Sequence, residues 1–166
     1  MQRAASYDAA HSEIHGFCAE ATMFKKILVA TDGSELSNKA IGVAVDLAKA
    51  LGAGIVGMTA VEAYPYVAVG EFSPAAYNDF QAHAAAMAND RLAAVERAAR
   101  VAGLVYESRM AESSAPYRAI IDAARDAGCD LIVMASHGRR GLGAVLLGSE
   151  TQRVLTHAEC PVLVVR

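Results

Sequence analysis

The chain has 166 residues, enough for one domain with a hydrophobic core and too few for two. Hydrophobic residues make up 54% of it and charged residues 20%, which excludes a chain that is disordered throughout. With a net charge of −3, the sequence gives no indication of the basic face that nucleic-acid binding usually needs, and no run of about 18 apolar residues is present to span a membrane.

The first 22 residues differ in composition from everything after them. They hold no apolar stretch of the kind found in signal peptides, and Met23 is a second candidate start, so we expect residues 1–22 to form a mobile N-terminal extension outside the core. His11, His15 and Cys18 invite comparison with a metal site. The HExxH order is absent, however, and no fourth ligand is evident, so no metal site is predicted.

The three cysteines are Cys18, Cys129 and Cys160. They are odd in number and widely spaced, which favours reduced thiols over a disulfide framework. The sequence therefore predicts a cytoplasmic protein.

From residue 26 onward, short apolar runs alternate with helical patterns. The first strand is expected over 27–31 and, after a turn at Asp32, a helix follows that ends near Gly52. A second strand over 55–61 leads into a long loop over 62–76. The later elements are expected as a helix over 77–102, a strand over 104–110, a helix over 116–127, a strand over 130–134, a helix reaching 157 and a strand over 162–165.

This order of elements predicts an α/β fold: a single open five-stranded parallel sheet with helices on both faces, joined by right-handed crossovers. In such a Rossmann-like sheet, ligands bind beyond the carboxyl ends of the strands, at the point where the strand order reverses. The residues that follow the first, second and fourth strands should meet there.

A glycine-rich loop follows the fourth strand. After it stands Ser149, the expected N-cap of the last helix. Such a loop lets backbone N–H groups approach an anion, and the first turn of the helix adds unpaired N–H donors. The loop has no GxxxxGK[ST] motif, and Leu146 replaces the third glycine of the dinucleotide fingerprint. The remaining pattern is a small residue, two others, glycine, nine residues and Gly-Ser, carried by Ala135, Gly138, Gly148 and Ser149.

With this pattern the chain resembles the universal stress protein family, whose nucleotide-binding members carry Gly-x-x-Gly, nine residues and Gly-Ser or Gly-Thr after the fourth strand. The resemblance covers about 140 residues, 23–166, and includes the opening FKKILVATDGS and the closing PVLVV. It implies one adenine-nucleotide-hydrolase-like domain over 23–166. It also implies ATP as ligand, with Mg²⁺ able to share the phosphate charge, and a homodimer built on the C-terminal strand 162–166.

The resemblance further implies roles for single residues. Asp32 would contact the ribose, the backbone near Ala60 the adenine, and the glycine loop the phosphates, with Arg139 and Arg140 as added positive charge. The candidate nucleotide-binding residues are Ala30, Thr31, Asp32, Ala60, Val61, Met134, Ala135, Gly138, Arg139, Arg140, Gly148, Ser149, Glu150 and Thr151. For Asp32 the alternative is a turn residue that bonds its own backbone.

Two residues depart from the family pattern. Ala135 replaces the first glycine, which matters only if the backbone there has a positive φ. Glu150 follows the expected helix cap, where its carboxylate would favour the helix and repel a triphosphate.

Three functions remain open on this sequence. The favoured one is an ATP-binding sensor or regulator of the stress response. The second is a member without nucleotide that acts by dimerisation and partner binding, and the third is a slow ATP-cleaving enzyme. For the third, Ser136 and His137 would be the tempting pair, but there is no GxSxG elbow and sequence neighbours seldom face each other, so no catalytic residue is predicted.

Overall fold

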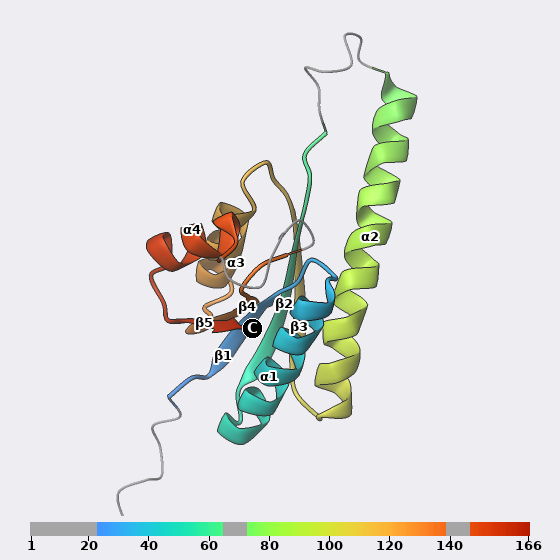
Figure 1. The fold of residues 1–166 in the computed structure, drawn as a ribbon. Helices are drawn as coiled ribbons and strands as arrows, with labels where there is room; N and C mark the ends of the chain where they lie inside the picture. The colour runs from blue at the N-terminus through green and yellow to red at the C-terminus, as the bar shows by residue number, and fades with distance from the viewer. Residues whose placement is uncertain (1–22, 65–72, 139–146) are drawn as a thin grey trace, which may run out of the picture.

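The computed structural model describes residues 23–64, 73–138 and 147–166. The expectations for residues 1–22, Arg139 and Arg140 lie outside these described residues. The elements, in chain order, are β1 (Lys26–Ala30), α1 (Glu35–Leu51), β2 (Gly54–Val61), α2 (Pro74–Val101), β3 (Tyr106–Glu112), α3 (Pro116–Asp126), β4 (Leu131–Ala135), α4 (Ser149–His157) and β5 (Val162–Val165) (Figure 1).

The five strands form one parallel sheet, as predicted, and the structure shows their order to be β3-β2-β1-β4-β5. Figure 1 shows α1 and α2 on one side of this sheet and α3 and α4 on the other. Parallel strands are therefore joined through helices, and these helices cover both faces of the sheet.

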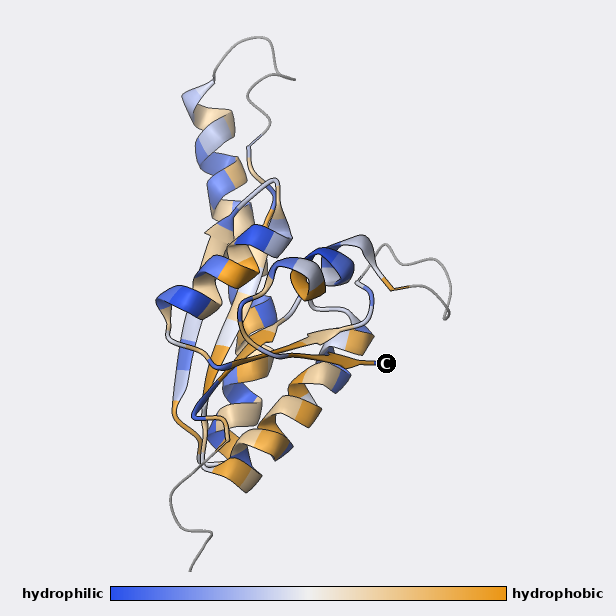
Figure 2. Ribbon diagram, turned by 90° about the vertical axis from the view of Figure 1, so that its left-hand side faces the viewer, coloured by the Kyte–Doolittle hydropathy of each residue, from blue (hydrophilic) through white to orange (hydrophobic). Residues whose placement is uncertain are grey.

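Alternate residues of the central strands supply two separate cores. On β1, Ile27 and Val29 pack with α1 and α2, whereas Leu28 and Ala30 pack with α3 and α4. Every residue of β4 is buried, which explains the unbroken apolar run that marked it in the sequence. In Figure 2 apolar colour runs along strands of the sheet, including the strand that leads to the C-terminus. Among the described helices, none is both long and apolar enough to cross a membrane.

Three expected boundaries were wrong by two residues or more, and one of them is the end of β3, which lies at Glu112 and not at 110. Helix α2 begins at Pro74, three residues before the expected start, because the Ser73 hydroxyl accepts from the N–H of Ala76 and proline is tolerated in a first turn. Strand β3 begins at Tyr106 and not at 104. Gly103 has a φ of 71°, and the next N–H, that of Leu104, bonds the carbonyl of Ala99, so this residue belongs to the end of α2.

The N-cap of α4 is Gly148 and not Ser149. The Gly148 backbone is extended, its carbonyl accepts from the N–H of Gln152 at 2.9 Å, and Ser149 is the first helical residue. A Cβ at this position would lie 3.2 Å from Cα of His137, which explains why the N-cap residue is glycine.

Candidate functional site

The strand order reverses between β1 and β4, because β1 leads to α1 on one face and β4 leads toward α4 on the other. The two strands pair in register, with Ala30 beside Met134, so the segments after them leave the sheet at the same edge. Ala30 also pairs with Met58, which places Ala60 and Val61 at that edge too. The structure therefore brings the predicted site residues of β1, β2 and β4 together at the carboxyl edge of the sheet, beside the crevice between the segments that follow β1 and β4.

Asp32 lies at the centre of this edge. One of its carboxylate oxygens accepts from the N–H of Ser34 at 3.0 Å, as expected of a turn residue. The other points across the crevice, where a Cβ added to Gly138 would lie 2.6 Å from Oδ2. Thr31 is buried and steadies the same turn, since its hydroxyl accepts from the N–H of Gly33 at 3.2 Å. The turn thus holds one carboxylate oxygen toward the β4 side.

The start of α4 is fixed onto the end of β4. The N–H of Gly148 donates to the carbonyl of Ser136 at 2.8 Å, and a Cβ on Gly148 would lie 3.2 Å from Cα of His137. The hydroxyl of Thr151 donates to the carbonyl of Ala135 at 3.0 Å. No side chain of the described residues caps α4, so N–H groups of its first turn remain as anion donors.

Glu150 does not have the surroundings expected from its place in the sequence. Its Oε2 accepts from the N–H of Tyr117, in the first turn of α3, at 2.9 Å, and its Oε1 pairs with Nη1 of Arg153 at 2.9 Å. The N-cap of α3, Ala115, has no side-chain cap bond of its own. Glu150 therefore serves as the acceptor for the start of α3, and its charge is met by an arginine and a helix dipole.

Ala135 is the last residue of β4 and pairs with Val165. A strand residue has a negative φ, so alanine adds no backbone strain here. The position needs a small side chain and does not need glycine.

Ser136 and His137 do face each other, contrary to expectation, with Oγ and Nδ1 3.2 Å apart. Ser136 is only 4% exposed, however. A buried hydroxyl of this kind is poorly placed to attack a substrate. In the part of the chain that the structure describes, no group of three or more His, Cys, Asp or Glu could hold a metal ion.

Arg91 is the site residue that the sequence interpretation missed. It reaches from α2 to the end of β2, where Nη1 donates to the carbonyl of Ala60 at 3.2 Å and to Oγ1 of Thr59 at 3.4 Å. The only signal in the sequence is its spacing, four residues after Met87 and four before Val95 on the expected core stripe of the helix.

Glu112 is the last residue of β3 and pairs with Val61, the residue after Ala60 on β2. Its carboxylate accepts from Nε2 of Gln81 at 2.7 Å and from the N–H of Tyr64 at 2.8 Å. These two hydrogen bonds hold the pKa of the Glu112 carboxyl below its usual value. Its charge is thus engaged by α2 and by the segment that follows β2.

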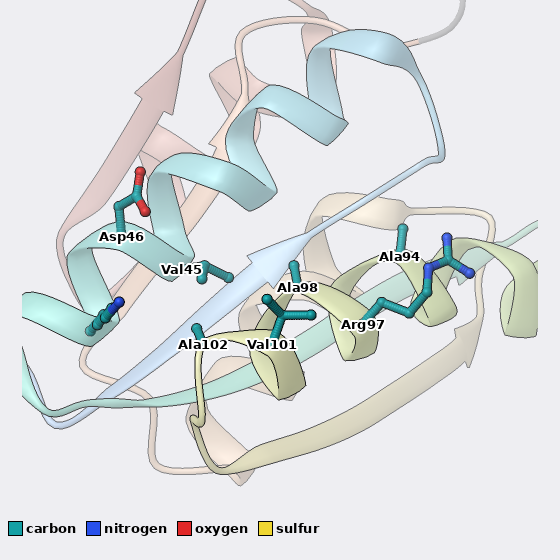
Figure 3. A pocket seen from close by; sticks show the side chains of 8 residues that line it. Val45, Asp46, Ala94, Arg97, Ala98, Val101 and Ala102 are labelled. Atoms are coloured by element: carbon teal, nitrogen blue, oxygen red, sulfur yellow. The ribbon is translucent and has the colours of Figure 1, made fainter.

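Two surface hollows among the described residues can be compared as ligand sites. The larger, about 560 Å³, lies between the C-terminal halves of α1 and α2 (Figure 3). Its floor is apolar, with Asp46, Lys49 and Arg97 around it, and it lies away from the carboxyl edge. The smaller, about 400 Å³, lies at that edge between the start of α1 and the residues after β4, where His137 and Gly138 line it. The second location is the one where polar groups of several elements converge.

Comparison with known proteins shows which family the chain belongs to. Its residues 23–166 match the model of the universal stress protein family. A universal stress protein of Methanocaldococcus jannaschii is 33% identical over 144 residues, which are 87% of this chain and 83% of that protein. One of Thermus aquaticus is 34% identical over 144 residues, 87% of this chain and 100% of that protein.

Solved structures agree in fold. Universal stress protein UspA from Lactobacillus plantarum has a TM-score of 0.69 at 25% identity and covers 86% of this chain and 97% of its own. A universal stress protein in complex with cAMP has a TM-score of 0.61 at 23% identity over 86% of this chain and 97% of its own. A family protein from Arabidopsis thaliana with AMP bound has a TM-score of 0.61 at 18% identity over 84% of this chain and 90% of its own. With a family match over nearly its whole length and two relatives above 30% identity, the chain belongs to the universal stress protein family.

Proposed function

We propose that this protein binds an adenine nucleotide, ATP in its full form, in the crevice at the carboxyl edge of the sheet, and that binding lets it act as a sensor or regulator in the stress response. One observation carries the proposal. The approach of Gly138 to Asp32 and of Gly148 to Ser136 brings a carboxylate and the donor end of α4 to one crevice. Family members with cAMP and AMP bound support the choice of an adenine nucleotide.

The strand order supports one direction for the proposed ligand. The phosphates would lie on the first turn of α4, at Gly148, Ser149 and Thr151, where N–H donors and the helix dipole favour an anion. The ribose hydroxyls would bond Asp32 over β1. The base would then reach the end of β2, at Ala60 and Val61.

Two further features of the described residues suit this assignment. Ala30, Thr31 and Met134, at the ends of β1 and β4, are buried. Glu150 is turned toward α3, so the repulsion expected between its carboxylate and a triphosphate loses its main basis. Mg²⁺ would be held mainly by phosphate oxygens, with Arg139 and Arg140 proposed to add positive charge.

We also propose that the protein is a homodimer through β5. This strand lies at the edge of the sheet and pairs only with β4 among the described strands. Leu163, in the middle of β5, is 37% exposed, and a bare apolar edge strand exposes unpaired backbone groups to any other chain. A two-fold related copy of β5 would satisfy both the backbone groups and the apolar side chain.

The cytoplasm is the proposed location. Cys129 and Cys160 are free thiols, and burial raises the pKa of Cys129 to about 11, so this thiol stays protonated at neutral pH. Unpaired, unreactive cysteines suit a reducing compartment.

The test is isothermal titration of the full chain with ATP, with and without Mg²⁺. Saturable binding by the wild type and its loss in Gly148→Val are expected, because the added side chain would meet the backbone of His137 and displace the start of α4. Gly42→Val is the matched control, since a Cβ there would meet no atom within 4 Å apart from its chain neighbours and the nearby backbone of its own helix. A wild type that takes up no nucleotide at millimolar concentration would overturn the proposal.

A further inference from the structure

At the end of β2, where the nucleotide base is proposed to lie (the base end of the crevice), Arg91 donates to the carbonyl of Ala60, which has no hydrogen-bond donor from the sheet. Along β2, the carbonyl of Met58 bonds the N–H of Thr31, whereas that of Val61 bonds a residue beyond β3. Carbonyls alternate sides along a strand, so that of Ala60 faces β1. Because β1 ends at Ala30, opposite Met58, the chain has already turned away at this level. Nη1 of Arg91 takes the place of the missing strand donor.

The route of the Arg91 side chain crosses the turn that carries Asp32. Gly33 in this turn has a φ of 77°, and a Cβ added to it would lie 3.1 Å from Cγ of Arg91. Only glycine tolerates both the backbone conformation and this close approach. The side chain is therefore laid over the β1–α1 turn and held by Thr59 and Ala60, half-buried at the base end.

The positive charge of the Arg91 guanidinium is not neutralised by a carboxylate within the described segments. Both of its acceptors are neutral oxygens, and the ion pairs found within the described segments do not include Arg91. Arginine stays protonated, and a half-buried charge without a carboxylate partner is costly. Such a charge is compensated when a ligand supplies an aromatic face or ring acceptors.

We propose that Arg91 is a ligand-contacting residue that binds the base of the nucleotide: its guanidinium stacks on or donates to the purine ring while the carbonyl of Ala60 keeps its second lone pair for the base amino group. This inference rests on the proposed function. It adds a recognition residue on α2, outside the glycine loop and the β1 turn. Because the contact is with the base, it contributes equally to the binding of AMP and of ATP.

Arg91→Gln separates this role from a structural one. Glutamine keeps an N–H donor for the carbonyl of Ala60, so the bond that holds the end of β2 can persist, while the positive charge and the planar fork are lost. Arg91→Met removes the donor as well and keeps an unbranched stem over Gly33. Arg97→Met, at the rim of the hollow in Figure 3, is the matched control on the same helix with the same change of charge.

Titrations of the full-length variants with AMP and with ATP test the proposal. Arg91→Gln should weaken both ligands by about tenfold, the equivalent of one charge-assisted hydrogen bond, with an unchanged melting temperature, and Arg97→Met should bind like the wild type. Wild-type affinity in Arg91→Gln, or a much larger loss for ATP than for AMP, would overturn the inference and leave the proposed function standing. A wild type that binds neither ligand would overturn both. If Arg91→Met does not fold, Arg91→Gln alone decides.

Discussion

Gly138→Ala is the sharpest perturbation of the crevice. The φ of Gly138 lies outside the left-handed region, so alanine strains no backbone there. Its new Cβ would lie 2.6 Å from Oδ2 of Asp32, where ordinary contact begins at 3.4 Å, so the carboxylate has to move by about 0.8 Å. The substitution therefore displaces the Asp32 side chain without changing its chemistry.

The magnitude follows from what the carboxylate does in each state. A hydrogen bond to a charged group contributes about 1.5–3 kcal/mol, so losing the bond between Asp32 and the ribose should weaken ATP about 10- to 100-fold. In the protein without nucleotide, the short side chain can yield, at the cost of bending its bond to the N–H of Ser34. Bending that bond without losing it should cost about 1 kcal/mol, which lowers the melting temperature by about 2–4 °C.

The assay pairs isothermal titration with thermal unfolding for the wild type, Gly138→Ala and Gly42→Ala. Gly42 lies in α1 with open space around its Cβ, so alanine there should raise the stability by about 0.5–1 kcal/mol and leave ATP binding unchanged. Wild-type affinity in Gly138→Ala would refute the reasoning, because it would mean that the Asp32 carboxylate can move without consequence for the ligand.

Three further substitutions or truncations test other parts of the structure. Glu150→Gln should lower the unfolding free energy by about 1 kcal/mol in chemical denaturation, because the start of α3 at Tyr117 loses a charged acceptor. The same substitution should leave the ATP affinity within about twofold of the wild type. A large gain in affinity would mean that the Glu150 carboxylate does repel the triphosphate. Leu163→Lys should shift light scattering from twice the chain mass toward the monomer, whereas Leu155→Lys, on the exposed side of α4, should not; a monomeric wild type would contradict the β5 interface. A chain that begins at Met23 should keep the melting temperature of the full chain, and a loss of several degrees would mean that residues 1–22 pack on the domain.

The sequence alone determined the elements, their order and the class of fold. Strand and helix periodicity are local, so the apolar run of β4 and the helical stripe of α1 could be read directly, and the alternation of strands and helices leaves few topologies. Local capping decided two of the misplaced boundaries, the starts of α2 and β3. At the start of α2, the Ser73 hydroxyl accepts from the N–H of Ala76, three residues further on. At the end of α2, the N–H of Leu104 bonds the carbonyl of Ala99 because Gly103 has a left-handed backbone. A stripe of apolar residues reveals neither interaction.

The strand assignments also predicted that the candidate site residues share one edge of the sheet, because strand ends of a parallel sheet meet whatever the length of the crossovers. It could not tell which side chains turn toward that edge. Glu150 is adjacent to the helix cap in sequence, yet its carboxylate bonds Tyr117, 33 residues away. Arg91 looks like one more position on the α2 stripe, yet it bonds Ala60, 31 residues away.

Only the tertiary structure decided these contacts. Each depends on how two elements from distant parts of the chain are placed by packing, and neither element carries a local signal of the other. The approach of Gly138 to Asp32 is of the same kind, because it arises where β1 and β4 leave the sheet side by side. Periodicity and caps are properties of a segment, so the sequence determined the framework, and the chemistry of the crevice came from contacts that exist only once the sheet has formed.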